Sequence, residues 1–228
     1  MAAAKLTERQ GKIRHNMTRI EPEFFLRDDV IKIACELIGC SIHTNINGHK
    51  VSALVTETEA YNGVHDKAAH SYDGRFTERT RTMYRPAGIA YVYLCYGVHH
   101  LFNVVVGQQG DPKAILLRAI WPLSGMEVMH SRRGKELLEH KIGSGPGTSS
   151  EALGIKTSHN GTDLQGDVIW LEERIVQPKE NDIIVGPRIG VDHAEEDAEL
   201  PYRFRLLPST TKQLLNGALV EDRIHGNP

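Results

Sequence analysis

Apolar side chains recur at helical spacing in two parts of the chain. The first part lies between Pro22, which suits the first turn of a helix, and Gly39, which suits the position just after one. The second part runs from about Ser124 to Lys141, and Thr148 then marks a further helix entry. The pattern therefore predicts a few separate helices rather than an all-helical protein.

The remaining apolar positions lie in short β-rich runs. Asn47-Gly48 separates the first two runs and is the strongest short-range signal for a type I′ hairpin. Since the connections between runs are mostly short, neighbouring strands are expected to pair antiparallel. The predicted strands cover residues 40–46, 49–59, 89–96, 101–107, 114–120, 167–172, 183–191 and 202–207. The sequence therefore predicts one mixed α+β domain, in which helices flank a largely antiparallel sheet.

Two stretches contain few apolar positions. Residues 62–88 are rich in turn-forming residues and show little apolar periodicity, which predicts a long irregular loop. Long loops inside compact domains are often functional. Residues 1–19 are basic and sparse in apolar side chains, which predicts a loose N-terminal arm followed by a single domain over residues 20–228.

The composition limits the class of protein. The chain has 228 residues, which fits one domain, and its 27 Lys and Arg against 29 Asp and Glu give a formal net charge of −2. These values exclude disordered, collagen-like, coiled-coil and disulfide-scaffold classes. No apolar run is long enough to span a membrane, and the N-terminus lacks the apolar core of a secretion signal. The three cysteines include no CxxC pair, which suits a reducing cytosol.

Charge is unevenly spread along the chain. Residues 75–85 contain four arginines and one glutamate, whereas residues 192–199 contain five acidic residues and no lysine or arginine. A net charge near zero does not exclude strong local electrostatic fields. One basic patch and one acidic patch are therefore expected. Solvated charged faces would explain both runs equally well.

Glu57, Glu59 and Tyr61 follow one another at the end of a predicted strand. Because side chains alternate along a strand, all three are expected on one face. Two carboxylates beside an irregular loop suit acid–base chemistry, since like charges and partial burial separate their pKa values. Two exposed strand glutamates would give the same pattern, so the spacing leaves both interpretations open.

Histidine and aspartate gather in the long loop and at the next hairpin tip. Imidazole and carboxylate groups suit zinc, iron or manganese, so a metal-dependent hydrolase that uses Glu59, His65, Asp66 and His70 is one hypothesis. The spacing matches no specific zinc signature, and solvated or hydrogen-bonding histidines explain the cluster more simply. The cluster consists of His65, Asp66, His70, Asp73, His99 and His100.

Three of the seven tyrosines, Tyr91, Tyr93 and Tyr96, stand within six residues of one another, just before Gly97. Aromatic rings beside a turn glycine could stack on a base or wedge into a duplex. Tyrosine also has a high β propensity and packs well in a core, which predicts the same enrichment. A non-catalytic nucleic-acid-binding domain with a basic loop and an aromatic hairpin is therefore a second alternative.

Seven motifs occur in one order between about Phe24 and Arg205. They are Glu57-Thr58-Glu59-Ala60-Tyr61, Ala68-Ala69-His70-Ser71, Tyr91-Val92-Tyr93 followed by Tyr96-Gly97, Asn103, Leu116-Leu117-Arg118-Ala119, Ser144-Gly145-Pro146-Gly147 and Arg188-Ile189-Gly190-Val191. Together they resemble one family, the alkyladenine (3-methyladenine) DNA glycosylases, which excise alkylated purines. Seven motifs in order are far more specific than any one of them, so chance explains the likeness poorly.

The resemblance implies a mixed domain around a curved antiparallel sheet, and it implies roles for matching positions. Glu59 resembles the general base that activates the water attacking the sugar. Arg118 resembles the arginine that helps to hold this glutamate and the water. Tyr61, His70 and Tyr93 resemble the walls that sandwich the extruded base.

Further roles follow from the same resemblance. Asn103 resembles the pocket residue that disfavours the exocyclic amino group of normal guanine, and Tyr96 resembles the wedge that fills the gap left by the flipped nucleotide. Glu57 is expected to have only a structural role, and the acidic 192–199 run is expected to face away from DNA. Contacts to phosphates, which position a duplex without reading its sequence, are expected from Arg75, Arg79 and Arg81.

The implied reaction is monofunctional hydrolysis of the N-glycosidic bond of alkylated or deaminated purines, which leaves an abasic site. 3-Methyladenine and 7-methylguanine are the implied substrates, whereas hypoxanthine and 1,N6-ethenoadenine depend on the width of the pocket. No lysine among the motifs can form a Schiff base, so neither a lyase step nor a metal or organic cofactor is expected. The expected partner is double-stranded DNA with a damaged purine. The protein is expected to be monomeric and free of membrane contact, in the cytoplasm of a prokaryote or the nucleus of a eukaryote.

Overall fold

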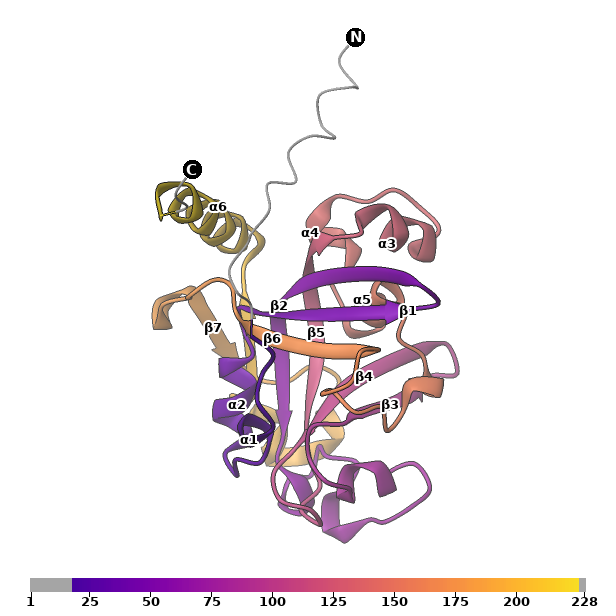
Figure 1. Cartoon of the computed structure of the whole chain (residues 1–228). Helices are drawn as coiled ribbons and strands as arrows, with labels where there is room; N and C mark the ends of the chain where they lie inside the picture. The colour runs from indigo at the N-terminus through magenta and orange to yellow at the C-terminus, as the bar shows by residue number, and fades with distance from the viewer. Residues whose placement is uncertain (1–17, 226–228) are drawn as a thin grey trace.

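The computed structural model describes residues 18–225, with side chains up to residue 218. Within this range, eight strands form one open sheet in the order β3-β4-β5-β2-β1-β6, and β8 pairs with both β2 and β7 (Figure 1). All of the pairs are antiparallel. The strands are β1 (Cys40–Ile46), β2 (His49–Tyr61), β3 (Ala90–Cys95), β4 (His99–Val106), β5 (Lys113–Ser124), β6 (Ile169–Arg174), β7 (Ile183–Gly186) and β8 (Arg203–Leu206).

Helices flank the sheet in separate groups. Figure 1 shows α1 and α2 together on one side of the molecule and α3, α4 and α5 gathered on another. The helices are α1 (Pro22–Phe25), α2 (Val30–Glu36), α3 (Met126–Arg133), α4 (Glu139–Ile142), α5 (Pro146–Leu153) and α6 (Pro208–His225). The prediction of a single α+β domain around a largely antiparallel sheet is confirmed.

The long helices predicted from the sequence are each divided in two. The predicted 22–39 helix is interrupted after α1, and α2 begins afresh because the Asp29 side chain accepts a hydrogen bond from the Lys32 N–H and caps it. The predicted 124–141 helix starts late, since Ser124 still belongs to β5. It is then interrupted, because Gly134 adopts a left-handed conformation at the end of α3 and α4 begins only at Glu139.

Most predicted strands are present, with different ends. The Asn47-Gly48 hairpin is confirmed, and both residues have the positive φ that a type I′ turn requires, 55° and 78°. The predicted 183–191 strand was wrong beyond Gly186, since Pro187 has no N–H to donate to a sheet. β5 continues to Ser124, past the predicted end at residue 120.

β2 changes direction partway along its length. Its first half pairs with β1, its second half pairs with β8, and β5 pairs along most of it. The register against β5 shifts on both sides of Glu57, which marks β-bulges, and bulges bend a strand. Figure 1 shows β2 turning away from β1 to run down the sheet. Glu57 and Glu59 therefore lie where β2 is flanked by β5 and β8.

The main core lies between the sheet and the helices that pack on it. α2 packs on β2, and α5 packs on β4 and β5. Side chains such as Ile33, Val55 and Phe102 are completely buried there. Burial of one such side chain stabilises the fold by roughly 1.5–3 kcal/mol, so these contacts hold the central strands firmly in place.

The predicted N-terminal arm lies mostly outside the described residues, which begin at Thr18. Arg19 is described, and it pairs with Glu172 of β6 through a β-bridge while its guanidinium donates to Asp167. The end of the predicted arm is therefore attached to the domain. Among the described residues, no helix combines the length and apolar character needed to cross a bilayer.

Candidate active site

A pocket of about 270 Å³ opens where β2, β3, β4 and β5 meet the 189–193 segment. Residues from across the chain line it, and many of them belong to the seven motifs. They include Tyr61, His70, Arg79, Tyr91, Tyr93, Cys95, Tyr96, Asn103, Arg118, Pro146, Ile189 and His193. The fold thus brings most of the predicted site residues to one place.

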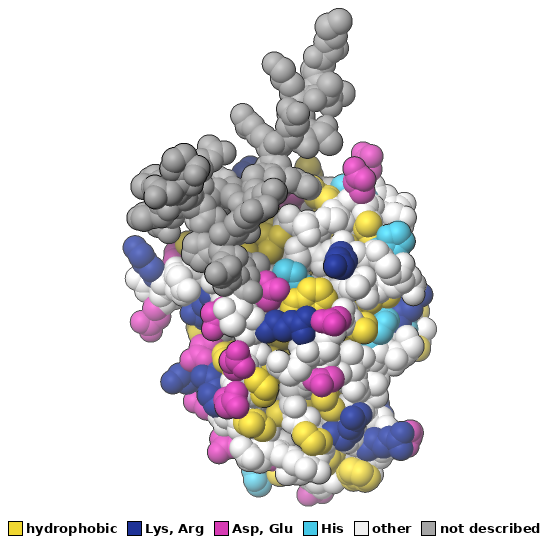
Figure 2. Space-filling view, viewed as in Figure 1, with side chains coloured by type: hydrophobic (Ala, Val, Ile, Leu, Met, Phe, Trp, Pro, Cys, Tyr) yellow, Lys and Arg dark blue, Asp and Glu magenta, His cyan; other side chains and the backbone are white. Residues whose placement is uncertain are grey.

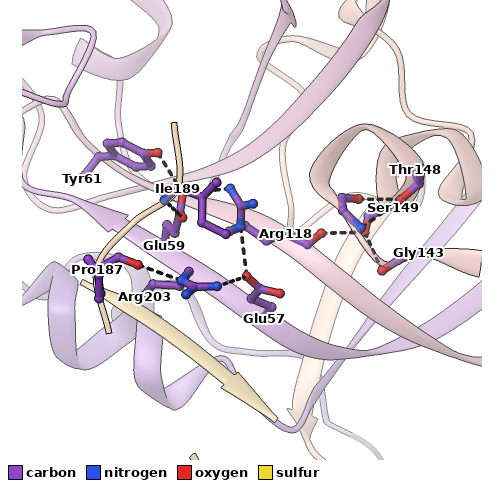
Figure 3. Close-up of polar contacts among 11 residues, drawn as sticks. Glu57, Glu59, Tyr61, Arg118, Gly143, Thr148, Ser149, Pro187, Ile189 and Arg203 are labelled. Carbon is purple, nitrogen blue, oxygen red and sulfur yellow. Dashed lines mark hydrogen bonds and ion pairs between the residues drawn. The ribbon is translucent and has the colours of Figure 1, made fainter. Parts of the chain in front are cut away.

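Glu59 lies directly behind this pocket and has no exposed surface. Figure 3 shows three groups that converge on its carboxylate. The Tyr61 hydroxyl and the Arg118 guanidinium donate to Oε2 at 2.9 and 3.2 Å, and the Ile189 N–H donates to Oε1 at 2.8 Å. Because Tyr61, Arg118 and Ile189 all line the pocket, the carboxylate is held in one orientation directly behind them, although Glu59 is not itself a lining residue.

Burial is the main influence on the acidity of Glu59. It raises the pKa of this carboxyl above the ordinary 4.5, against the lowering effects of Arg118, the Ile189 N–H and the Tyr61 hydroxyl. Burial also raises the pKa of Tyr61 well above its ordinary value, so its hydroxyl keeps the proton that it donates. A carboxyl with a raised pKa takes up a proton more readily than an ordinary glutamate, as a general base must.

Glu57 and Arg203 fix the arginine that reaches Glu59. The Arg118 Nε donates to Glu57 Oε1 at 3.0 Å, and Arg203 donates to the same oxygen at 3.2 Å (Figure 3). Ser149 of α5 in turn donates to the Arg118 carbonyl. As strand alternation predicts, one face of β2 carries Glu57, Glu59 and Tyr61. Glu57 holds the guanidinium that faces Glu59.

The pocket walls are aromatic. The His70 ring stands edge-on to Tyr93 with ring centroids 4.7 Å apart, and Tyr91 packs beside Tyr93 at 5.4 Å. Arg79 can only donate, so its 3.1 Å hydrogen bond makes His70 Nε2 an acceptor, and Nδ1 then donates to the Tyr91 hydroxyl at 3.0 Å. Burial, followed by Arg79, lowers the pKa of His70 to about 4, so the ring is neutral above that pH.

Asn103 lies on the buried side of the pocket. Its side-chain amide nitrogen donates to the carbonyls of Tyr91 and Leu101, at 3.1 and 3.3 Å. With only 3% of the residue exposed, these two bonds fix the side chain in place. A base edge entering the pocket would therefore meet a rigid polar group.

Tyr96 projects from the tip of the β3–β4 hairpin. It is 94% exposed and has a φ of 50°, an uncommon conformation for a bulky residue, and Gly97 follows with a φ of 71°. Val98 closes the turn by donating to the Cys95 carbonyl at 3.1 Å. The type I′ geometry thus presents a large ring to solvent beside the pocket, as a wedge requires.

Gly147, from the Ser144–Gly147 motif, lies against the same hairpin. A Cβ at this position would lie 2.9 Å from His99 Nδ1, which only glycine avoids. This motif therefore supports the hairpin that carries Tyr96 from the side of α5.

The predicted phosphate-contacting arginines lie in different surroundings. Arg75 is exposed, and Arg81 pairs with Glu78 at 2.8 Å. Arg79 lies over the Tyr93 ring and lines the pocket instead of pointing away from it. On the face seen in Figure 2, basic and acidic side chains are interspersed, with no continuous field of either sign.

Some of the negative charges in the acidic 192–199 run are paired with a lysine. Lys67 pairs with Glu195 and Glu196, at 2.5 and 2.8 Å, and its backbone N–H donates to Asp197. Val191 and His193, at the start of this run, line the pocket. The run is therefore partly neutralised and begins at the pocket, which the sequence did not indicate.

Arg188 is the main residue that sequence reasoning missed, although it belongs to one of the seven motifs. It forms a completely buried ion pair with Asp66, at 2.5 and 2.8 Å, and donates to the Ala60 carbonyl. Its guanidinium also lies 5.0 Å from the Tyr61 ring centroid. The next residue supplies the Ile189 N–H, so this pair anchors both a pocket wall and a donor to Glu59.

The residues of the metal hypothesis are not arranged as ligands. Asp66 is bound by Arg188, and the two ring nitrogens of His70 are bonded to Tyr91 and Arg79. In the described part of the chain, no three His, Cys, Asp or Glu side chains are grouped closely enough to hold a metal ion.

A larger hollow of about 790 Å³ lies beside the β3–β4 hairpin. His99, His100, Glu127, Arg132, Glu151 and Lys156 are among its lining residues. No tyrosine, phenylalanine or tryptophan of the described chain lines it. The aromatic walls and the buried carboxylate make the smaller pocket the better candidate for chemistry on a planar ring.

Known proteins resemble the chain over most of its length. The family model described as Methylpurine-DNA glycosylase (MPG) matches residues 23–209. Three bacterial relatives are each named "Putative 3-methyladenine DNA glycosylase". The protein of Chlamydia felis (strain Fe/C-56) is 43% identical over 84% of this chain and 97% of its own. Those of Desulfitobacterium hafniense (strain Y51) and Bacillus cereus (strain AH187) are 41% and 39% identical, over 83% and 80% of this chain and 96% and 93% of their own. The chain belongs to the methylpurine-DNA glycosylase family.

Proposed function

We propose that the protein hydrolyses the N-glycosidic bond of alkylated purines in duplex DNA and leaves an unbroken strand with an abasic site. The observation that carries this proposal is the carboxylate of Glu59, held by three donors behind an aromatic pocket. 3-Methyladenine and 7-methylguanine are the proposed substrates, and hypoxanthine and 1,N6-ethenoadenine are candidates to be tested beside them. The protein is proposed to act as a monomer. Its proposed location is that of the DNA, the cytoplasm of a prokaryote or the nucleus of a eukaryote.

The proposed reaction starts by flipping the nucleotide. A base inside a duplex is out of reach of the pocket, so the nucleotide must leave the stack at a cost of a few kcal/mol. Tyr96, exposed at the hairpin tip, fills the gap and offsets part of that cost. The basic loop with Arg75 and Arg81 contacts phosphates and positions the duplex.

Bond cleavage relies on Glu59. As the base departs, the sugar gains oxocarbenium character, which a nearby carboxylate stabilises electrostatically. The same carboxylate takes a proton from the attacking water. Arg118 keeps Glu59 in position, since its guanidinium is fixed by Glu57 and donates to Glu59.

The walls favour alkylated bases. Alkylation at N3 or N7 makes a purine cationic in DNA, and the electron-rich faces of Tyr61 and Tyr93 attract such a ring by about 0.5–2 kcal/mol. Asn103 meets the base edge and disfavours the exocyclic amino group of guanine. Water is the proposed nucleophile, because Lys67 pairs with Glu195 and Glu196, and no lysine of the described chain lines the pocket.

We expect the wild-type protein to release 3-methyladenine and 7-methylguanine from alkylated duplex DNA in excess EDTA. Chromatography would identify the free bases, and the strand should stay intact until alkali opens the abasic site. The control is the same duplex without alkylation. Loss of release in EDTA would contradict the proposal in favour of a metal-dependent hydrolase, and direct strand cleavage would contradict the monofunctional assignment.

We also expect the rate of base release to fall as the solution becomes acidic. Only the ionised carboxylate accepts a proton, and Glu59 has a pKa raised above 4.5, so kcat/KM should fall as the pH drops through that raised value. His70 stays neutral over this range because its pKa is about 4. The measurement is kcat/KM for 7-methylguanine release against pH. An acid limb centred at or below 4.5 would show that Glu59 is not the titrating base.

A further inference from the structure

Arg79 occupies the pocket of the free protein. Its guanidinium carbon lies 4.6 Å from the Tyr93 ring centroid, and its Nη2 donates to His70 Nε2 at 3.1 Å. Both Tyr93 and His70 line the pocket, as does Arg79 itself. A planar cation therefore already covers an aromatic wall.

The guanidinium and a purine compete for the same surface. A flipped base would stack on the ring face that Arg79 covers, and an alkylated purine offers the same features, a flat ring and a positive charge. Two such cations cannot share one face without repulsion. Entry of the base therefore requires the Arg79 side chain to move.

Arg79 is held by contacts to neutral groups, the Tyr93 ring, the His70 imidazole and the Tyr91 hydroxyl, which a phosphate can replace. In the described chain, no carboxylate lies within ion-pair distance of Arg79, whereas Glu78 pairs with Arg81. A hydrogen bond to a neutral imidazole is weaker than the charge-assisted, bidentate bonds that arginine makes with phosphate. Because Arg79 lies on an exposed part of the loop, its side chain can reach toward a bound backbone.

We propose that Arg79 is a latch on the base pocket, closed over Tyr93 in the free protein and drawn out by a phosphate of bound DNA. This inference rests on the proposed function, since it assigns the pocket to a base. The latch makes the pocket available to a purine only where a duplex backbone is also present. Free purines, which bring no phosphate, must displace the guanidinium unaided.

The test is binding of two free bases to the wild type and to Arg79→Gln, measured by equilibrium dialysis without DNA. The probes are 7,9-dimethylguaninium, which is a cation while N1 keeps its proton in slightly acidic buffer, and hypoxanthine, which is neutral. We expect Arg79→Gln to bind the cation about tenfold more tightly than the wild type, equivalent to about 1.4 kcal/mol, and hypoxanthine more tightly by a smaller factor. Arg79→Lys, which keeps the charge, should fall between the two proteins.

The affinity for duplex DNA is expected to change in the opposite direction to the affinity for free bases. For Arg79→Gln, we expect weaker binding to duplex DNA and a plot of log K against log salt that is shallower by about 1, because one phosphate contact is lost. Arg81→Gln is the matched control, expected to weaken duplex binding with no change in free-base affinity. A merely structural role would weaken both kinds of binding in Arg79→Gln.

The latch is overturned if Arg79→Gln binds both free bases no more tightly than the wild type. That result leaves the proposed function standing as long as the wild type releases base from alkylated duplex. If the wild type releases none, the proposed function itself fails, whatever the behaviour of Arg79→Gln.

Discussion

Replacing Glu59 by glutamine is expected to lower the rate of base release by about 10³-fold or more while duplex binding is retained, because it removes both the proton acceptor and the charge opposite the sugar. The amide keeps the shape of the side chain and can still accept from the Ile189 N–H. With its oxygen toward Ile189, the amide turns its NH2 toward the Arg118 and Tyr61 donors, which costs stability. Burial, which raises the pKa of Glu59, disfavours the charge that the substitution removes, so the two effects on stability oppose each other, and retained duplex binding shows that the variant is folded. Single-turnover base release and duplex affinity are the two measurements.

Glu57→Gln is the matched control for this substitution. Glu57 accepts from Arg118 and Arg203, so its loss acts only through these two arginines and should cost much less activity. Equal losses in the two variants would argue against Glu59 as the base. If neither the wild type nor Glu59→Gln releases base and both still bind the duplex, the result favours a non-catalytic nucleic-acid-binding domain.

Replacing Arg188 by methionine is expected to destabilise the fold by about 3–5 kcal/mol, because it leaves the Asp66 carboxylate buried without its cation. For a chain of this size, such a loss lowers the thermal midpoint by roughly 6–20 °C. Urea and thermal unfolding would measure it. The substitution also removes the support behind Tyr61 and loosens the segment that supplies the Ile189 N–H, so base release should fall as well.

Two variants test whether the buried charge is the cause. Arg27→Met breaks a partly exposed pair with Glu36 and should cost less than about 1 kcal/mol. The double variant Asp66→Asn with Arg188→Met removes both charges of this pair and should regain part of the lost stability. If Arg188→Met unfolds at the same urea concentration as Arg27→Met, the Asp66–Arg188 pair does not stabilise the fold.

Local patterns predicted the elements of this fold better than their ends. The Asn47-Gly48 turn is specified by the two residues that form it, so the sequence predicts it well. The helix predicted over residues 22–39 is interrupted because Asp29 caps a new helix, a side-chain preference that competes with apolar periodicity. The bend in β2 depends on how β1, β5 and β8 pair around it, and no local pattern carries that information.

In the candidate site too, local patterns predicted some features and missed those that depend on the tertiary fold. Alternation along β2 predicted that Glu57, Glu59 and Tyr61 share a face, but only the tertiary fold brings Arg118 between the two carboxylates. The partner of Arg188 lies 122 positions away, and spacing says nothing about such a pairing. Arg79 was predicted as a phosphate contact because it stands in a basic run, and that run gave no sign of the aromatic face it covers.

The position of Glu59 on a strand paired on both edges has a consequence for how the protein opens. Its backbone is bonded to β5 on one side and β8 on the other, so it is released only when the sheet itself comes apart. The hairpin tip at Tyr96 and the loop that bears Arg79 lie at the surface, where low-energy local fluctuations concentrate. The groups that we propose to meet DNA can therefore rearrange many times during each search along a duplex, while the proposed catalytic carboxylate keeps its geometry throughout.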